Sequence, residues 1–340
     1  MARHQRAPRG TCGTRRTRRH LALTEPRAVS AYRDAERTLW RSLDVVPEER
    51  WLRLPTLGTD VRIQELGQGR PVLFIHGGST AGSSWAELAA ALPDVRCLLL
   101  DRPGTGLSAP LPAPVRDIAA LQRVADVLIP DVLDALDLAT GDVVATSFSG
   151  WFALRAALAA PSRIGRLALF GWTAGAPVGR LPWMLRIGVM PVIGDLIDRL
   201  PVTEASVGAI FRAIGSGDAV ADGRITREAI GAYAALLRWT PTLRNDRDLG
   251  RLFLSARGLD DRIVLTADER GRITSPIDWL WGGRDAFGGE SIARSFVAPF
   301  PDCRLTIASS AGHAPWVDDL AMATSFVRTA LERSEADGHG

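Results

Sequence analysis

Short apolar segments that alternate with turns and helical stretches constrain the fold of this chain more than any other feature. They read PVLFI (71–75), VRCLLL (95–100), DVVAT (142–146), RLALFG (166–171), IDWLW (277–281) and CRLTIA (303–308). A continuous apolar run is typical of a strand that is buried on both faces. Helical spacing covers Val115–Leu138, Phe152–Ala160 and Pro315–Glu332. Strands that alternate with helices in this way predict a doubly wound, mostly parallel sheet.

The chain before and between these segments differs in pattern. A helix is expected from Ala31 to Ser42, followed by Trp51–Leu54 and Val61–Glu65, whose alternating residues suit an antiparallel hairpin. From Thr173 to about Ile273 the chain reads as helices broken by Pro and Gly, with one possible strand at 262–266. We predict a disordered Arg-rich tail (1–29), a core (30–172 and 274–335) and a helical lid (173–273). The lid would cover the edge where open α/β sheets place their sites.

Charge is unevenly distributed along the chain. The first twenty residues hold seven Arg and no acid, so removing them from the net charge of +3 leaves −4. Clustered Arg can neutralise phosphate, but we interpret the segment as a solvated leader and expect no nucleic-acid partner. Its Arg pairs lack the apolar stretch of an export signal, and no segment is apolar enough to predict a membrane helix. The widely spaced Cys12, Cys97 and Cys303 fit a cytoplasmic protein.

Two shortages of residue types exclude several kinds of chemistry. All 41 basic residues are Arg, and without a lysine the chain can form neither a Schiff base nor a lysine-containing phosphate loop. Of the five histidines, only His76 and His313 lie away from the chain ends. We therefore expect no metal site and no organic cofactor.

Three loops that follow strands each carry one reactive side chain. Ser147 lies where a buried strand turns into a helix, Asp285 follows IDWLW, and His313 follows CRLTIA. The order Ser, Asp, His is that of α/β-hydrolases. The usual nucleophile motif is G-x-S-x-G, whereas here Ala145 and Ser149 occupy the glycine positions. The serine could instead cap the helix, and the Asp could belong to an ordinary turn.

A glycine-rich loop follows the first buried strand. In FIHGGSTAGSSW, the peptide N–H of Gly78, together with that of Phe148 after the serine, could form an oxyanion hole. His76 is interpreted as a residue that holds this loop rather than as a base. Asp318 and Asp319 are interpreted as capping and dipole partners of the last helix.

The chain resembles the α/β-hydrolase superfamily. The resemblance rests on FIHGGSTAGSSW, LLLDRPGTGLS, VVATSFSGWFALRAAL, DWLWGGRD and SAGHAPWVDD, which span the core from about residue 50 to 332. It implies an eight-stranded sheet and acyl transfer through Ser147, Asp285 and His313, with Gly78 and Phe148 as the oxyanion hole. The expected partner is a small hydrophobic carbonyl compound such as an ester or lactone. We expect a monomer or a homodimer.

The same residues also allow two other functions. Hydrolases that cleave carbon–carbon bonds in meta-cleavage products share an HGG loop followed by a Trp, so Trp85 keeps that activity as an alternative. A catalytically silent ligand-binding or interaction protein is a further alternative, because fold does not fix function. The tentative pocket residues are Ser79, Trp85, Trp172, Trp183 and Met184. The lid residues Trp183 and Met184 could instead simply pack the lid onto the core.

Overall fold

The computed structural model describes residues 27–179, 181–188, 190, 200–255 and 258–333. Its centre is an eight-stranded sheet with the order β1-β2-β4-β3-β5-β6-β9-β10. The pairs β1–β2 and β2–β4 are antiparallel, and the remaining pairs are parallel. The strands are β1 (Glu48–Leu54), β2 (Thr59–Leu66), β3 (Arg70–Ile75), β4 (Val95–Leu100), β5 (Gly141–Thr146), β6 (Ile164–Thr173), β9 (Ile277–Gly282) and β10 (Cys303–Ala308). This confirms the predicted α/β-hydrolase sheet.

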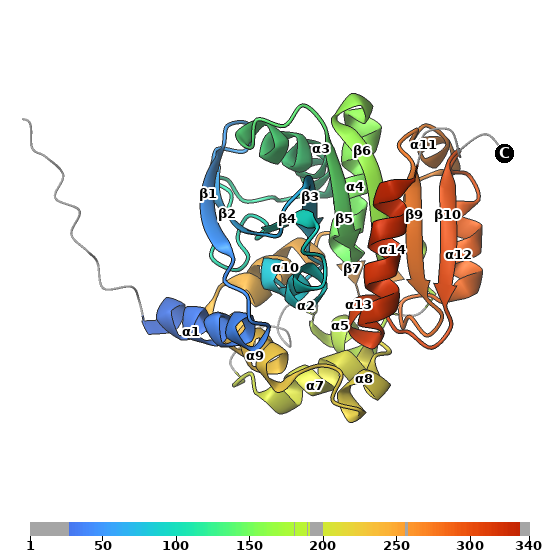
Figure 1. Cartoon of the computed structure of the whole chain (residues 1–340). Helices are drawn as coiled ribbons and strands as arrows, with labels where there is room; N and C mark the ends of the chain where they lie inside the picture. The colour runs from blue at the N-terminus through green and yellow to red at the C-terminus, as the bar shows by residue number, and fades with distance from the viewer. Residues whose placement is uncertain (1–26, 180, 189, 191–199, 256–257, 334–340) are drawn as a thin grey trace, which may run out of the picture.

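Helices cover both faces of the sheet (Figure 1). One face packs against α3 (Ile118–Ala135), α4 (Ser147–Ala159) and α12 (Glu290–Val297). The other packs against α2 (Ala86–Ala90), α13 (Pro315–Asp318) and α14 (Leu320–Glu332). The short 3-10 helices η1 (Gly82–Trp85) and η2 (Pro161–Arg163) complete the connections.

The central strands are apolar throughout because both of their faces are covered. In β3, Val72 and Phe74 belong to the core on the side of α14, and Leu73 and Ile75 belong to the core on the side of α3. All four side chains are at most 1% exposed. Successive strand residues point to opposite faces, so a run without polar residues satisfies both cores at once.

The chain between β6 and β9 is mainly helical. It contains α5 (Trp183–Gly188), α7 (Glu204–Ala213), α8 (Gly217–Ala221), α9 (Arg227–Trp239), α10 (Thr242–Gly250), the short strands β7 (Leu254–Ser255) and β8 (Gly258–Leu259), η3 (Asp261–Ile263) and α11 (Ala267–Gly271). In Figure 1, α7, α8 and α9 gather below the sheet. We call residues 174–276 the insertion.

The possible strand at 262–266 is wrong. The chain forms η3 at residues 261–263, where the Asp260 carboxylate accepts a hydrogen bond from the Arg262 N–H at 2.9 Å, and residues 264–266 are neither helix nor strand. Within the described residues, no helix is both long and apolar enough to span a membrane.

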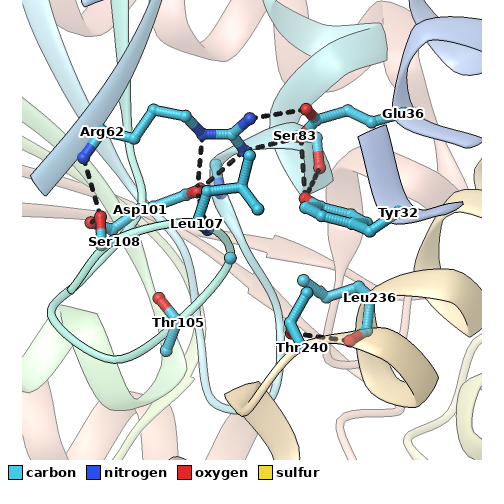
Figure 2. Close-up of polar contacts among 12 residues, drawn as sticks. Tyr32, Glu36, Arg62, Ser83, Asp101, Thr105, Leu107, Ser108, Leu236 and Thr240 are labelled. Atoms are coloured by element: carbon cyan, nitrogen blue, oxygen red, sulfur yellow. Dashed lines mark hydrogen bonds and ion pairs between the residues drawn. The ribbon is translucent and has the colours of Figure 1, made fainter. Parts of the chain in front are cut away.

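The first described helix, α1 (Arg27–Ser42), packs against α9 of the insertion and is fixed to the core by buried charges (Figure 2). Arg62 on β2 donates to both carboxylate oxygens of Glu36, at 2.7 and 2.8 Å, and to Asp101 at 2.9 Å. The Tyr32 hydroxyl donates to Glu36 at 2.8 Å. Burial acts to lower the pKa of Arg62, but the charges of Asp101 and Glu36 outweigh it and raise that pKa well above its usual value. We call Tyr32, Glu36, Arg62 and Asp101 the α1 cluster.

Candidate active site

Ser147 is the first residue of α4 and directly follows β5. Its φ angle is 54°, a left-handed conformation that residues other than glycine seldom adopt. The Thr173 hydroxyl donates to the Ser147 carbonyl at 2.9 Å and helps to hold this turn. The predicted position of Ser147 between a buried strand and a helix matches the backbone, which is strained at this residue.

The two residues that replace the usual glycines fit the turn without disrupting it. Ala145 is fully buried in the sheet core. Ser149 is also fully buried, and its hydroxyl donates to the His76 carbonyl at 2.5 Å. The extra hydroxyl thus ties the serine turn to the glycine-rich loop rather than remaining an unpaired polar group.

The His313 ring is bonded to a buried carboxylate. Its Nδ1 lies 2.8 Å from Asp285 Oδ2. Asp285 also accepts from the backbone N–H of Trp172 at 2.8 Å and of Phe287 at 2.9 Å, which fixes the orientation of the carboxylate. The Phe287 ring lies beside the imidazole, 4.5 Å between centroids. An imidazole that donates from Nδ1 to a carboxylate leaves Nε2 available as a base.

Hydrogen bonds to the insertion hold the loop that carries His313. The His313 N–H donates to the carbonyl of Ile214 at 2.9 Å. Asp318 accepts from the Gly312 N–H at 2.7 Å and from the Ser216 hydroxyl at 3.0 Å. Burial raises the pKa of Asp318. Asp319 caps α14 through the Met322 N–H, as predicted, whereas Asp318 is the last residue of α13 and its carboxylate binds the histidine loop instead of capping α14.

The glycine-rich loop passes close to Ser147. A Cβ atom on Gly77 would lie 3.2 Å from the Ser147 Cβ, so only a residue without a side chain permits this approach without displacement. His76 holds the loop, as predicted: its Nε2 accepts from the Arg102 N–H at 3.1 Å, and its Nδ1 lies 2.8 Å from the Gly77 carbonyl. Burial, then the nearby Arg102 charge, lowers the pKa of His76 well below its usual value.

A cavity of about 660 Å³ lies between the insertion and the loops at the strand ends. Ser147, His313, Gly78 and Phe148 all line it. Most of its wall is apolar, and the insertion contributes Ile210, Phe211, Ile214, Leu236, Leu237 and Phe253. Ser147 and His313 thus face one cavity, although in the described part of the chain no hydrogen bond joins them. Nor does any group of three or more His, Cys, Asp or Glu in that part form a potential metal site.

The comparison with known families agrees with this arrangement. The sequence model described as "Alpha/beta hydrolase family" matches residues 72–324, most of the chain. The chain belongs to the alpha/beta hydrolase family. The prediction of a hydrolase-type enzyme is thereby confirmed at the level of the family.

The curated relatives of this alpha/beta hydrolase include two kinds of enzyme. One is a 2-hydroxy-6-oxononadienedioate/2-hydroxy-6-oxononatrienedioate hydrolase of Cupriavidus pinatubonensis, 26% identical over 76% of this chain and 86% of the relative. Another is a pimeloyl-[acyl-carrier protein] methyl ester esterase of Chromobacterium violaceum, 29% identical over 80% of this chain and 97% of the relative. Among solved structures, carboxylesterase CesB of Bacillus subtilis has a TM-score of 0.70 with 17% identity, covering 90% of this chain and 99% of its own, which supports the fold.

The tentative pocket residues of the alpha/beta hydrolase divide into three groups. Ser79 and Trp172 line the cavity. Trp85 does not, and this prediction is wrong: the side chain is fully buried and packs against Phe74 and Trp316, at ring distances of 5.9 and 4.3 Å. The side chains of Trp183 and Met184 lie outside the described part of the structure.

Sequence reasoning missed two charged residues beside the glycine-rich loop. Asp246 of α10 and Arg102, in the turn after β4, form a buried ion pair of 2.7 Å. Asp246 lies in the polar run Arg244–Asp248, a pattern typical of a solvated helix face. Nothing in that pattern indicates that the carboxylate reaches the strand ends.

Proposed function

We propose that the chain is a serine hydrolase that cleaves an ester, lactone or related carbonyl of a hydrophobic small molecule. The observation that carries the proposal is the His313–Asp285 hydrogen bond in the wall of the cavity that also contains Ser147. A serine in a left-handed turn, an oriented imidazole and a buried carboxylate are the parts that acyl transfer needs.

The reaction would proceed through an acyl-enzyme. Ser147 Oγ attacks the carbonyl carbon while His313 Nε2 takes the hydroxyl proton, and Asp285 stabilises the resulting imidazolium. The oxyanion accepts hydrogen bonds from the N–H groups of Gly78 and Phe148. The first-turn amides of α4 have no acceptor within their own helix, which supports this role for Phe148. The intermediate then expels the alcohol, which takes the proton from His313.

Hydrolysis of the acyl-enzyme would repeat these steps with water. His313 removes a proton from the water as its oxygen attacks the acyl carbon, and then returns that proton to Ser147 Oγ as the acid leaves. The insertion would act as a lid that supplies the apolar wall for the acyl group. We propose this lid on the same cavity evidence.

Carbon–carbon hydrolysis of the meta-cleavage type remains a second candidate, because several of the relatives are named as hydrolases of 2-hydroxy-6-oxononadienedioate or 2-hydroxymuconate semialdehyde. A nonadienedioate is a dicarboxylate, and such an anion needs cationic partners. The cavity wall carries the acid Glu87 beside Arg247, and the charge of Asp246 in the same wall is already paired with Arg102, so the wall has no excess of cations. The balance of charge therefore favours a neutral ester.

The test is a series of p-nitrophenyl esters from acetate to laurate, run beside a vinylogous diketone. We expect kcat/KM to rise by up to about fourfold per methylene until the cavity is filled, because each buried methylene contributes about 0.8 kcal/mol. Ser147→Ala and His313→Ala should each lower kcat by about 10⁴-fold or more. Cleavage of the diketone with no cleavage of any ester would favour the second candidate, and cleavage of neither would contradict both.

A further inference from the structure

The helix α10 of the insertion contacts the loop that we assign to the oxyanion hole. Asp246 Oδ2 accepts the backbone N–H of Ser79 at 2.5 Å and the guanidinium of Arg102 at 2.7 Å. The side chains of Asp246 and Arg102 are only 3% and 2% exposed. On the same helix, the Thr242 hydroxyl accepts the Gly106 N–H at 2.9 Å. The insertion is therefore bonded both to the glycine-rich loop and to the turn after β4.

Arg102 also contacts this loop directly. Its guanidinium donates to the carbonyl of Gly77 at 2.9 Å, and it lies 5.3 Å from the centroid of the Phe148 ring. The Gly77 carbonyl also accepts from the Thr80 hydroxyl at 3.1 Å. One ion pair thus contacts the two peptide units on either side of Gly78.

The direction of the Gly78 N–H follows from these bonds. In a trans peptide the carbonyl and the following N–H point in opposite directions, and the structure contains no cis peptide bond among the described residues. Because the Gly77 carbonyl points to buried Arg102, the Gly78 N–H points away from it. Gly78 itself lines the cavity, and a Cβ there would meet nothing within 4 Å.

Ser79 shows that this loop conformation requires external support. Its φ angle is 56°, in the left-handed region that a serine adopts at a cost of about 1 kcal/mol or more. Its N–H bond to Asp246 offsets that cost only while α10 remains in place. Resting on the proposed function, we propose that Asp246, paired with Arg102, is a positioning residue that directs the Gly78 N–H toward the oxyanion.

The first test is Asp246→Asn. The variant keeps an acceptor of similar shape but removes the charge that binds Arg102 and Ser79 together. We expect kcat on a p-nitrophenyl ester to fall about 10- to 100-fold with KM changed less than about threefold, because a misdirected donor affects the transition state and not substrate binding. A trifluoromethyl ketone that forms a hemiketal with Ser147 should lose affinity by the same factor as kcat/KM. The matching secondary alcohol should bind as before.

The matched control is Glu36→Gln. This residue is also a buried carboxylate bonded to a buried Arg, but it lies in the α1 cluster and not in the cavity wall. We expect it to lower the melting temperature without changing kcat or ketone affinity. Equal loss of ketone and alcohol affinity in Asp246→Asn, or an unchanged kcat, would overturn the proposal.

Two further measurements keep the proposal testable if Asp246→Asn does not fold or if the chain is not a hydrolase. If Asp246→Asn is insoluble, the double variant Arg102→Met/Asp246→Asn can be used instead. It removes both buried charges together, which proteins tolerate better than the loss of one partner of a buried ion pair. The double variant should fold and should show the same loss of kcat. Wild-type activity there would overturn the proposal. If the wild type cleaves no carbonyl compound at all, amide hydrogen exchange still tests the loop. The Ser79 amide should exchange at least about tenfold faster in Asp246→Asn than in Glu36→Gln, and equal rates would contradict the positioning role.

Discussion

Two buried arginines, Arg62 and Arg102, form similar ion pairs in two regions of the molecule that we expect to have different roles, one in stability and one in activity. Each is at most 2% exposed and each binds a carboxylate from a distant segment. Asp101 and Arg102 are neighbours in the turn after β4, yet Asp101 joins the α1 cluster and Arg102 joins the cavity loop. Burial and charge alone therefore do not identify a functional pair. The difference lies in what the carboxylates hold besides the arginine. Glu36 belongs to α1 and Asp101 accepts the N–H groups of Gly82 and Leu107, whereas Asp246 accepts the N–H of Ser79, which lines the cavity.

The largest effect that should separate the two regions is on stability. Arg62→Met leaves the Glu36 and Asp101 carboxylates without their cation in a buried site, which should cost about 3–5 kcal/mol of unfolding free energy. The folded fraction should retain wild-type kcat, because the α1 cluster does not contact Ser147, Asp285 or His313. Urea unfolding together with active-site-normalised kinetics measures both quantities. A lower kcat in fully folded Arg62→Met would show that the α1 cluster also affects activity, which would contradict the proposed difference from the Arg102–Asp246 pair.

A smaller effect on the free energy of unfolding should come from His76, which holds the glycine-rich loop. Its pKa is lowered by burial and by Arg102, so between that value and the usual 6.5 the unfolded chain binds a proton that the folded chain does not. Stability is therefore fully present above pH 6.5 and decreases as the pH falls through the window below it, by up to about 1.4 kcal/mol per pH unit. A protonated Nε2 could no longer accept the hydrogen bond from the Arg102 N–H, and two donors would then face each other. His76→Asn should flatten this slope in unfolding curves from pH 5 to 7, and an unchanged slope would assign it to other groups.

The strands could be predicted from the sequence because their burial on two faces leaves an unbroken apolar run. VRCLLL and CRLTIA match β4 and β10 at both ends. The start of α4 was placed five residues late, at Phe152 instead of Ser147. The first turn of that helix is part of the serine turn, where Ser147, Ser149 and Gly150 stand among large apolar residues and the sequence shows no helical period.

The geometry of the candidate site follows from the sequence where one loop carries one reactive group, and not where distant segments meet. Ser147, Asp285 and His313 follow strands of one sheet, so topology alone brings them to one edge. Trp85 was misplaced because sequence does not distinguish an aromatic ring in a cavity wall from one packed on Phe74. Asp246 reaches the glycine-rich loop only through the docking of α10, which no local pattern records.

Covalent labelling of Ser147 tests most directly whether this chain is a serine hydrolase. The folded wild-type chain should take up one fluorophosphonate, and peptide mass spectrometry should locate it on Ser147. Ser147→Ala should take up none, and His313→Ala should react much more slowly because the hydroxyl has lost its base. A folded chain that takes up no label, or labelling that persists in Ser147→Ala, would contradict the account. The first of these results, combined with tight binding of a hydrophobic ligand, would indicate a catalytically silent member of the family.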